Sequence, residues 1–164
     1  VGALQAFCDS YGVTLQHMKL HGAFYNTACV THALADAGLD GLQAVNPNIA
    51  AMVLSGSYIA KEAQRRGIPV IQEVFADRGY TDEGTLVPRT ESGAFIKDSQ
   101  EALERVLMMV TEGKVVTNTG NTIDIVADSV CVHGDNPEAI AFTNYIREGL
   151  TKAGVTVANF QNRK

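Results

Sequence analysis

The sequence predicts a parallel α/β fold. A helix–glycine–strand junction occurs four times, in CDSYGVTL, AQRRGIPVI, MVTEGKVV and LTKAGVTV, with the glycine at positions 12, 67, 113 and 154. Glycine is favoured just after a helix C-terminus because it adopts the left-handed conformation at little cost, and a short β-rich run follows each one. Strands and helices therefore alternate, which is the pattern of a parallel sheet.

The elements follow from these junctions in chain order. We expect helix 2–11, strand 14–20, helix 27–44, strand 49–54, helix 57–66, strand 69–75, a polar loop over about 76–98, helix 99–112, strands 114–117, 122–127 and 129–133, helix 136–153 and strand 155–159. Gly38 marks either a fifth junction or a helix break. Ser99 is a plausible helix start, and Asn136 followed by Pro137 is typical of a capped helix N-terminus.

Both a barrel and an open sheet are compatible with this order. Neither GxGxxG after a strand nor GxxxxGK[ST] occurs, so two common nucleotide-binding signatures of open sheets are missing.

Composition excludes several classes of protein. The 164 residues fit one domain, and 46% hydrophobic residues exclude disorder. A net charge of −5 argues against a nucleic-acid partner, and no apolar run reaches the roughly 18 residues of a membrane span. The three cysteines, Cys8, Cys29 and Cys131, show no CxxC spacing, which indicates free thiols and a cytoplasmic location.

Charge is distributed unevenly along the chain. Residues 1–60 carry four charges, at Asp9, Lys19, Asp36 and Asp40, and the chain begins at Val1 within a predicted helix. We therefore expect the natural protein to begin earlier, and its apolar first third to pack against a leading segment that is missing here.

The first candidate site is the end of strand 14–20. His17, Lys19 and His21 share one face by the period of a strand. Such groups are costly to bury unless they are paired or bind something, so they predict a polar site with a proton shuttle and a cation. A structural histidine beside a snorkelling lysine, or a two-histidine metal site, stays open, and we assign no metal-binding residue.

Two further turns follow strands. Ser55-Gly56-Ser57 could hold an anion on its amides, or form an ordinary turn with Ser57 as the helix N-cap. The strand ending near Glu73 leads into the long loop, and loops of this length are often functional. The loop carries Asp77, Arg78, Tyr80 and Arg89. Its arginines could grip a carboxylate, with acids nearby to hold them, or an Asp–Arg pair could only fix the loop.

The fourth site follows strand 129–133. His133 is a candidate acid or base, and Asp135 lies within a turn of it. Cys131 and His133 could form a nucleophile pair, but same-face neighbours on one strand rarely align for proton transfer. His32 lies within a predicted helix and is expected to be structural or exposed.

Five of these segments, in this order and spacing, resemble the LamB/YcsF family: HMKLHGAFYN (17–26), EVFADRGY (73–80), LVPR (86–89), SGAFI (92–96) and CVHGD (131–135). Leu20 and Phe24 replace a proline and a leucine of the family pattern. The resemblance implies an irregular, seven-stranded β/α barrel of glycoside hydrolase/deacetylase type. Residues 1–164 would then form a single, incomplete barrel domain that lacks the first strands.

The resemblance also implies an activity, namely ATP-dependent opening of 5-oxo-L-proline to L-glutamate with 5-oxoprolinase subunits B and C, and with ATP as co-substrate. We expect the catalytic groups to be His17, Lys19, His21, Glu73 and His133. We expect the substrate-binding groups to be Asn26, Asp77, Arg78, Arg89 and Asp135. A metal-dependent deacetylase- or glycosidase-like hydrolase, and a non-catalytic carboxylate-binding subunit, are the alternatives.

Overall fold

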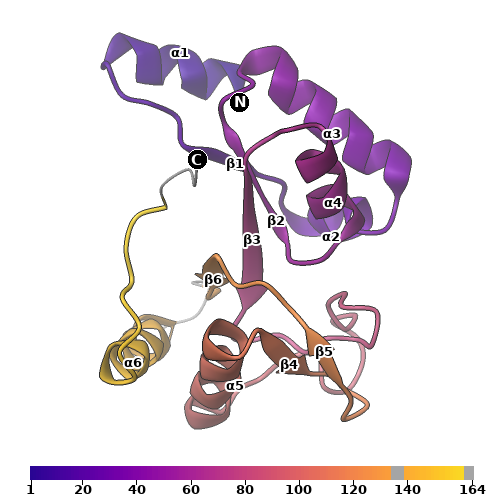
Figure 1. The fold of residues 1–164 in the computed structure, drawn as a ribbon, viewed down its shortest axis with the longest axis vertical. Coiled ribbons are helices and arrows are strands. Elements are labelled where there is room, and N and C mark those ends of the chain that lie inside the picture. Colours follow the sequence, from indigo (N-terminus) through magenta and orange to yellow (C-terminus); the bar gives the residue numbers. More distant parts are fainter. Residues whose placement is uncertain (134–138, 161–164) are drawn as a thin grey trace. The chain divides into compact units, whose positions relative to one another are not determined.

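A computed structural model describes residues 1–133 and 139–160 and confirms an α/β fold with parallel strand pairing. The chain divides into two compact units, residues 1–72 and residues 73–164. The strand order of the larger sheet is β1-β2-β3-β6, and β3 (Val70–Phe75) begins in the first unit and ends in the second. Figure 1 labels the elements along the chain.

The first unit is built on two parallel strands and four helices. Its elements are α1 (Gly2–Ser10), β1 (His17–Lys19), α2 (Gly22–Ala28), α3 (His32–Val45), β2 (Ala50–Leu54), α4 (Tyr58–Arg65) and the start of β3. β1 pairs with β2, so that His17 lies opposite Ala50 and Lys19 opposite Met52. Alanine and aliphatic side chains from α3, β2 and α4 form one buried core. The first unit therefore has a core of its own.

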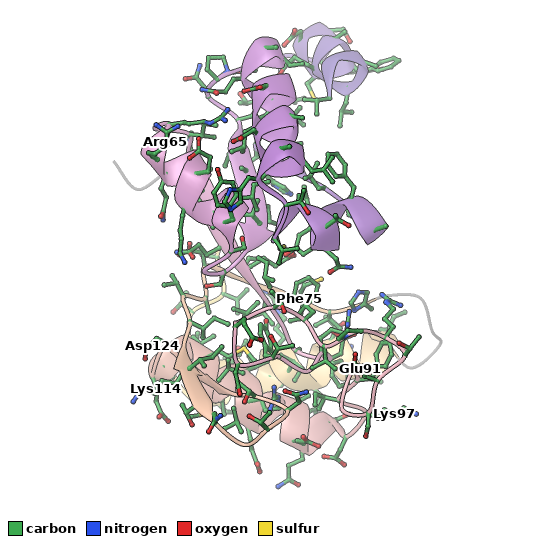
Figure 2. The ribbon with its side chains drawn as sticks, turned by 90° about the vertical axis from the view of Figure 1, so that its right-hand side faces the viewer. Arg65, Phe75, Glu91, Lys97, Lys114 and Asp124 are labelled. Carbon is green, nitrogen blue, oxygen red and sulfur yellow. The ribbon has the colours of Figure 1, made fainter. Side chains whose placement is uncertain are left out.

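The second unit combines the end of β3 with α5 (Ser99–Thr111), β4 (Lys114–Val116), β5 (Thr122–Asp124), β6 (Ser129–Cys131) and α6 (Ala139–Lys152). β6 runs parallel to β3. β4 and β5 instead form an antiparallel hairpin, across which Lys114 lies opposite Asp124 (Figure 2). Buried side chains of α5 and α6, together with Ala76, form the core of this unit.

The predicted helix ends at glycine are confirmed at all four junctions, but no strand follows Gly154 within the described residues. Gly12, Gly67, Gly113 and Gly154 each follow a helix and have φ values of +63°, +72°, +66° and +82°. Two helix starts are also capped. Ser57 accepts a hydrogen bond from the Ala60 amide, as one of the two alternatives for its turn predicted. The helix expected to start at Ser99 does so, and its cap is the preceding Asp98, which accepts a hydrogen bond from the Glu101 amide. These caps set where α4 and α5 begin.

The predicted loop over 76–98 is confirmed, and it is an ordered segment with its own backbone pairing. Isolated antiparallel bridges join Arg78 to Phe95 and Tyr80 to Leu86. The loop also returns on itself at Gly79, whose amide donates to the Ala94 carbonyl at 3.1 Å. The loop therefore presents its side chains from a defined frame.

Three element predictions are wrong in part. The single helix expected over 27–44 is two helices, α2 and α3, because the Cys29 carbonyl accepts the Tyr58 amide at the junction. Gly38 lies inside α3, which is not broken there. Residues 155–159 form no strand; Val155 instead donates to the Leu150 carbonyl, which closes the end of α6.

Some boundaries also differ. The expected strand 14–20 is shorter, since β1 covers only His17–Lys19, and the expected strand 122–127 is β5 over Thr122–Asp124. The expected helix start at Asn136 and Pro137 lies outside the described residues. Among the helices that the structure describes, none has the length and apolar character needed to cross a membrane.

Candidate functional site

The second unit brings together two of the predicted site residues, Asp77 and His133. β3 and β6 are parallel with Phe75 opposite Cys131, and the Ala76 amide donates to the Cys131 carbonyl at 3.0 Å. Asp77 and His133 each lie two residues beyond this register pair. The carboxyl ends of neighbouring parallel strands therefore deliver both side chains to one place, as parallel α/β proteins commonly do.

The two side chains form a direct hydrogen bond. His133 Nδ1 and Asp77 Oδ2 are 2.6 Å apart. The side chain of His133 is 29% exposed and that of Asp77 is 18% exposed. The ring of Phe75 stacks beside the imidazole, with centroids 5.8 Å apart and planes at 26°. The second carboxylate oxygen, Asp77 Oδ1, is buried without a hydrogen bond. The imidazole is thus held from two sides.

This pair lines a pocket of about 720 Å³ within the second unit. Its other walls include Phe95 and Lys97 from the long loop and Phe142 and Tyr145 from α6. Figure 2 shows Lys97 and Glu91 on this loop. Among the described lining residues, Lys97 is the one permanent cation. The pocket therefore combines a proton-transfer group, a positive charge and apolar walls, a combination typical of small-molecule sites.

None of these four wall residues was among the site residues predicted from the sequence. Phe95 belongs to a segment that carried the resemblance, so that signal could have drawn attention to it and to the adjacent Lys97. Phe142 and Tyr145 had no such signal, because aromatic residues at helical spacing are more often part of a core.

Arg78 mainly holds the loop together. It is almost fully buried, donates from Nε to the Ala94 carbonyl at 2.9 Å and from Nη2 to the Val87 carbonyl at 2.6 Å. Burial, and secondly the charge of Arg89, lower the pKa of its guanidinium. The expected loop-fixing Asp–Arg pair is wrong, because Asp77 bonds to His133 and Arg78 fixes the loop through backbone carbonyls. A substrate contact of Arg78 stays a prediction.

Arg89 differs from Arg78 in being exposed. Its guanidinium lies 5.5 Å from the centre of the Phe95 ring, and that of Arg78 lies 5.1 Å from the same ring. Because Phe95 also lines the pocket, Arg89 is placed near the pocket wall and can meet an anion from solvent. Its predicted substrate-binding role fits this position.

Glu73 and Tyr80 are buried. Glu73, on β3, lies opposite Ser129 and is 2% exposed. Tyr80 is fully buried, and its hydroxyl oxygen accepts the Phe75 amide at 2.9 Å. Burial raises the pKa of the Tyr80 hydroxyl above its ordinary value. Tyr80, which belongs to the long loop, thus fixes the backbone at the end of β3 through its hydroxyl.

In the first unit, the expected one-strand arrangement of His17, Lys19 and His21 is wrong in part. His17 and Lys19 share β1, but His21 lies beyond it as the exposed N-cap residue of α2, because the chain turns at Gly22 with φ +60°. His17 Nδ1 lies 3.2 Å from Gln16 Oε1, and Lys19 Nζ lies 5.5 Å from the centre of the Tyr25 ring.

The remaining candidates of the first unit have local contacts. Asn26 donates to the Gly22 carbonyl within α2, at 3.3 Å. The Gly56 amide donates to Gln72 Oε1 and Ser57 caps α4, so the turn takes its ordinary form. His32 begins α3 and stacks on Tyr58 with ring centres 3.6 Å apart.

Two candidates of the second unit complete the set. Asp135 lies outside the described residues. Cys131 ends β6 and is half-buried. Within the ranges 1–133 and 139–160, no three His, Cys, Asp or Glu side chains gather in an arrangement that could hold a metal ion.

Comparison with known proteins shows that this chain belongs to a known family. Residues 1–164 match the LamB/YcsF family. The match extends over the whole of this sequence.

Curated relatives include a protein of Fusobacterium nucleatum that is named as the A subunit of 5-oxoprolinase. It is 55% identical over 96% of this chain and 61% of its own length. Proteins with the same name from Brevibacillus brevis and Pyrococcus horikoshii are each 44% identical. The matches cover 96% of this chain and 62% of each of those two proteins. This chain thus spans less than two thirds of their length.

A solved structure is also similar. The crystal structure of a lactam utilization protein from Thermus thermophilus matches with a TM-score of 0.87 and 39% sequence identity, over 98% of this chain and 64% of that one.

Proposed function

Because the chain belongs to the LamB/YcsF family, we propose that it acts as the A subunit of an ATP-dependent 5-oxoprolinase, which hydrolyses the lactam of 5-oxo-L-proline to L-glutamate. The observation that carries the proposal is the His133–Asp77 pair in a pocket that also contains Lys97. The names of the relatives and of the similar solved structure supply the substrate class, a lactam.

The pocket matches what lactam hydrolysis requires. A lactam amide is unreactive, so water must lose a proton as it attacks and the ring nitrogen must gain one as it leaves. A histidine can serve as both base and acid. Lys97 and Arg89 supply charge for the substrate carboxylate, and Lys19 and Arg78 stay candidates for the same task. His17, His21 and Glu73 stay candidates for proton transfer, and Asn26 and Asp135 for substrate contacts.

ATP is the proposed co-substrate. Transfer of its terminal phosphoryl group to the lactam oxygen would make the ring carbon electrophilic, and the lysine and arginine side chains named above would offset the phosphate charge. The relatives are named as one lettered subunit, which supports the existence of further subunits. We propose that these are subunits B and C, in the cytoplasm. We also propose that the whole domain closes as an irregular, seven-stranded barrel of glycoside hydrolase/deacetylase type.

The proposal is tested by glutamate release from 5-oxo-L-proline, measured with and without ATP, by the protein in complex with subunits B and C. We expect His133→Gln to lower kcat by about 10²–10⁴-fold, the usual contribution of a general acid–base group. His32→Gln is the matched control, because His32 stacks on Tyr58 in the first unit, and should stay within about twofold of the parent. Absence of ATP-dependent glutamate from the parent complex would refute the proposal.

A further inference from the structure

We infer that Asp77 is a positioning residue that keeps the proton of His133 on Nδ1 and thereby leaves Nε2 free to act on the substrate. This inference gives Asp77 a role other than the substrate binding predicted from the sequence. Its catalytic part rests on the proposed function, whereas its structural part, the tautomer of His133, does not.

The backbone makes the pairing a property of the sheet. Both residues lie two positions beyond the same register pair of β3 and β6, and the ladder continues one step further through the Ala76 amide. Neither side chain depends on a long flexible connection to reach the other. Both residues lie just beyond a strand end, so the register of the two strands sets where their side chains start, and such support from regular elements helps to hold a reactive geometry.

The chemistry of the contact decides the tautomer. An ionised carboxylate can only accept hydrogen bonds, so the imidazole nitrogen 2.6 Å from Asp77 Oδ2 must be the donor. When His133 is neutral, a proton on Nδ1 leaves the lone pair on Nε2. The stacked ring of Phe75 limits rotation of the imidazole away from this arrangement.

The surroundings of Asp77 favour positioning over direct substrate binding. Oδ2 bonds to His133, and Oδ1 is buried below the surface, where a ligand in the pocket does not meet it. The neighbouring Arg78 directs Nε and Nη2 to two backbone carbonyls of the loop. Both residues line the pocket, and His133 is the better exposed member of the pair.

The resulting proton transfer balances. As the oxygen of water bonds to the ring carbon whose oxygen carries the phosphoryl group, one water proton passes to Nε2, and Asp77 stabilises the imidazolium that forms. When the C–N bond breaks, Nε2 returns this proton to the leaving nitrogen, and the carbon keeps the phosphoryl group as an acyl phosphate. A second water then releases inorganic phosphate and leaves the side-chain carboxylate of glutamate. Asp77 stays ionised throughout, and Nδ1 keeps its proton.

The structural part is tested by ¹⁵N NMR of the imidazole rings at pH 9, where the tautomers can be read from the two nitrogen shifts. His133→Gln identifies the His133 signals by their loss. We expect the parent to show the Nδ1–H form and Asp77→Asn to lose that preference. Asp124→Asn, on the hairpin, is the control and should behave as the parent. An Nε2–H form in the parent, or an unchanged tautomer in Asp77→Asn, would overturn the inference.

The catalytic part is tested in the glutamate-release assay. We expect Asp77→Asn to lower kcat by about 10²–10⁴-fold with little change in KM, because the wrong tautomer removes the base without removing substrate contacts. A raised KM with unchanged kcat would instead show that Asp77 binds substrate and would overturn the inference. If the parent complex makes no glutamate, the proposed function fails, while the tautomer measurement still decides the structural role of Asp77.

Discussion

At the scale of single residues, the buried hydroxyl of Tyr80 gives a sharp stability prediction. Tyr80→Phe keeps the ring but removes the acceptor of the Phe75 amide, which donates to it at 2.9 Å in a fully buried setting. Loss of one intramolecular hydrogen bond costs about 0.5–1.5 kcal/mol. We therefore expect the free energy of unfolding to fall by this amount in urea titrations.

The control for this prediction is Tyr11→Phe. Tyr11 follows α1 and is 81% exposed, so loss of its hydroxyl should change stability very little. Equal stability of Tyr80→Phe and the parent would show that the Phe75 amide finds another acceptor.

Two candidate residues that the sequence placed at or just after strand ends lie in contact in the structure. Asp77 and His133 were singled out because strand ends in a parallel sheet converge, and the structure brings these two together. Their mutual bond could not be predicted, because the register of β3 against β6 joins segments that are far apart in sequence. Lys97 was missed because a single lysine in a polar loop has no local pattern that distinguishes it.

At the scale of elements, the glycine junctions were the most reliable signal. Each marks a backbone conformation that most other residues avoid, so the sequence carries the information locally. The split between α2 and α3 was missed because it depends on a contact of Cys29 with Tyr58, which no local pattern contains. Residues 155–159 have the composition of a strand, but a strand forms only where a neighbouring strand offers a ladder.

The long loop depends on a glycine for its close return. A Cβ atom at Gly79 would lie 2.0 Å from the Gly93 carbonyl oxygen, a backbone atom that cannot rotate away. Gly79→Ala must therefore displace the loop that places Phe95 and Lys97. We expect a loss of about 1–3 kcal/mol in the free energy of unfolding, as for other overpacked sites, or somewhat more.

Gly41→Ala is the matched control for Gly79→Ala. Gly41 lies inside α3, and a Cβ atom there would meet nothing within 4 Å. Alanine should stabilise this helix by up to about 1 kcal/mol. Urea titration of both variants gives the comparison, and a Gly79→Ala protein as stable as Gly41→Ala would contradict the account of the loop.

At the scale of the whole molecule, acid should weaken both units, because each contains a carboxylate whose pKa is held down by hydrogen bonds. In the first unit, Glu62 accepts bonds of 2.6–2.7 Å from Arg65 and Arg66, which lower the pKa of Glu62 to about 2. In the second, bonds from Thr117 and Thr119 lower the pKa of Asp82. Asp82 thereby secures the β4–β5 hairpin.

The direction of the pH effect follows from proton linkage. A carboxylate with a lower pKa in the folded state binds fewer protons when folded, so its stabilising effect is present above the unfolded-state pKa of about 4.3 and is lost as pH falls towards the folded-state value. For Glu62 this places the loss of stability between about pH 4.3 and the folded-state pKa of about 2.

We expect the stability of the parent protein to fall across this pH interval. Glu62→Gln should be less stable at pH 7 and show a flatter decline, whereas Glu91→Gln, on the exposed loop, should follow the parent. Urea titrations from pH 7 to pH 2.5 measure this, and parallel curves for Glu62→Gln and the parent would mean that Glu62 is not the group that acid titrates.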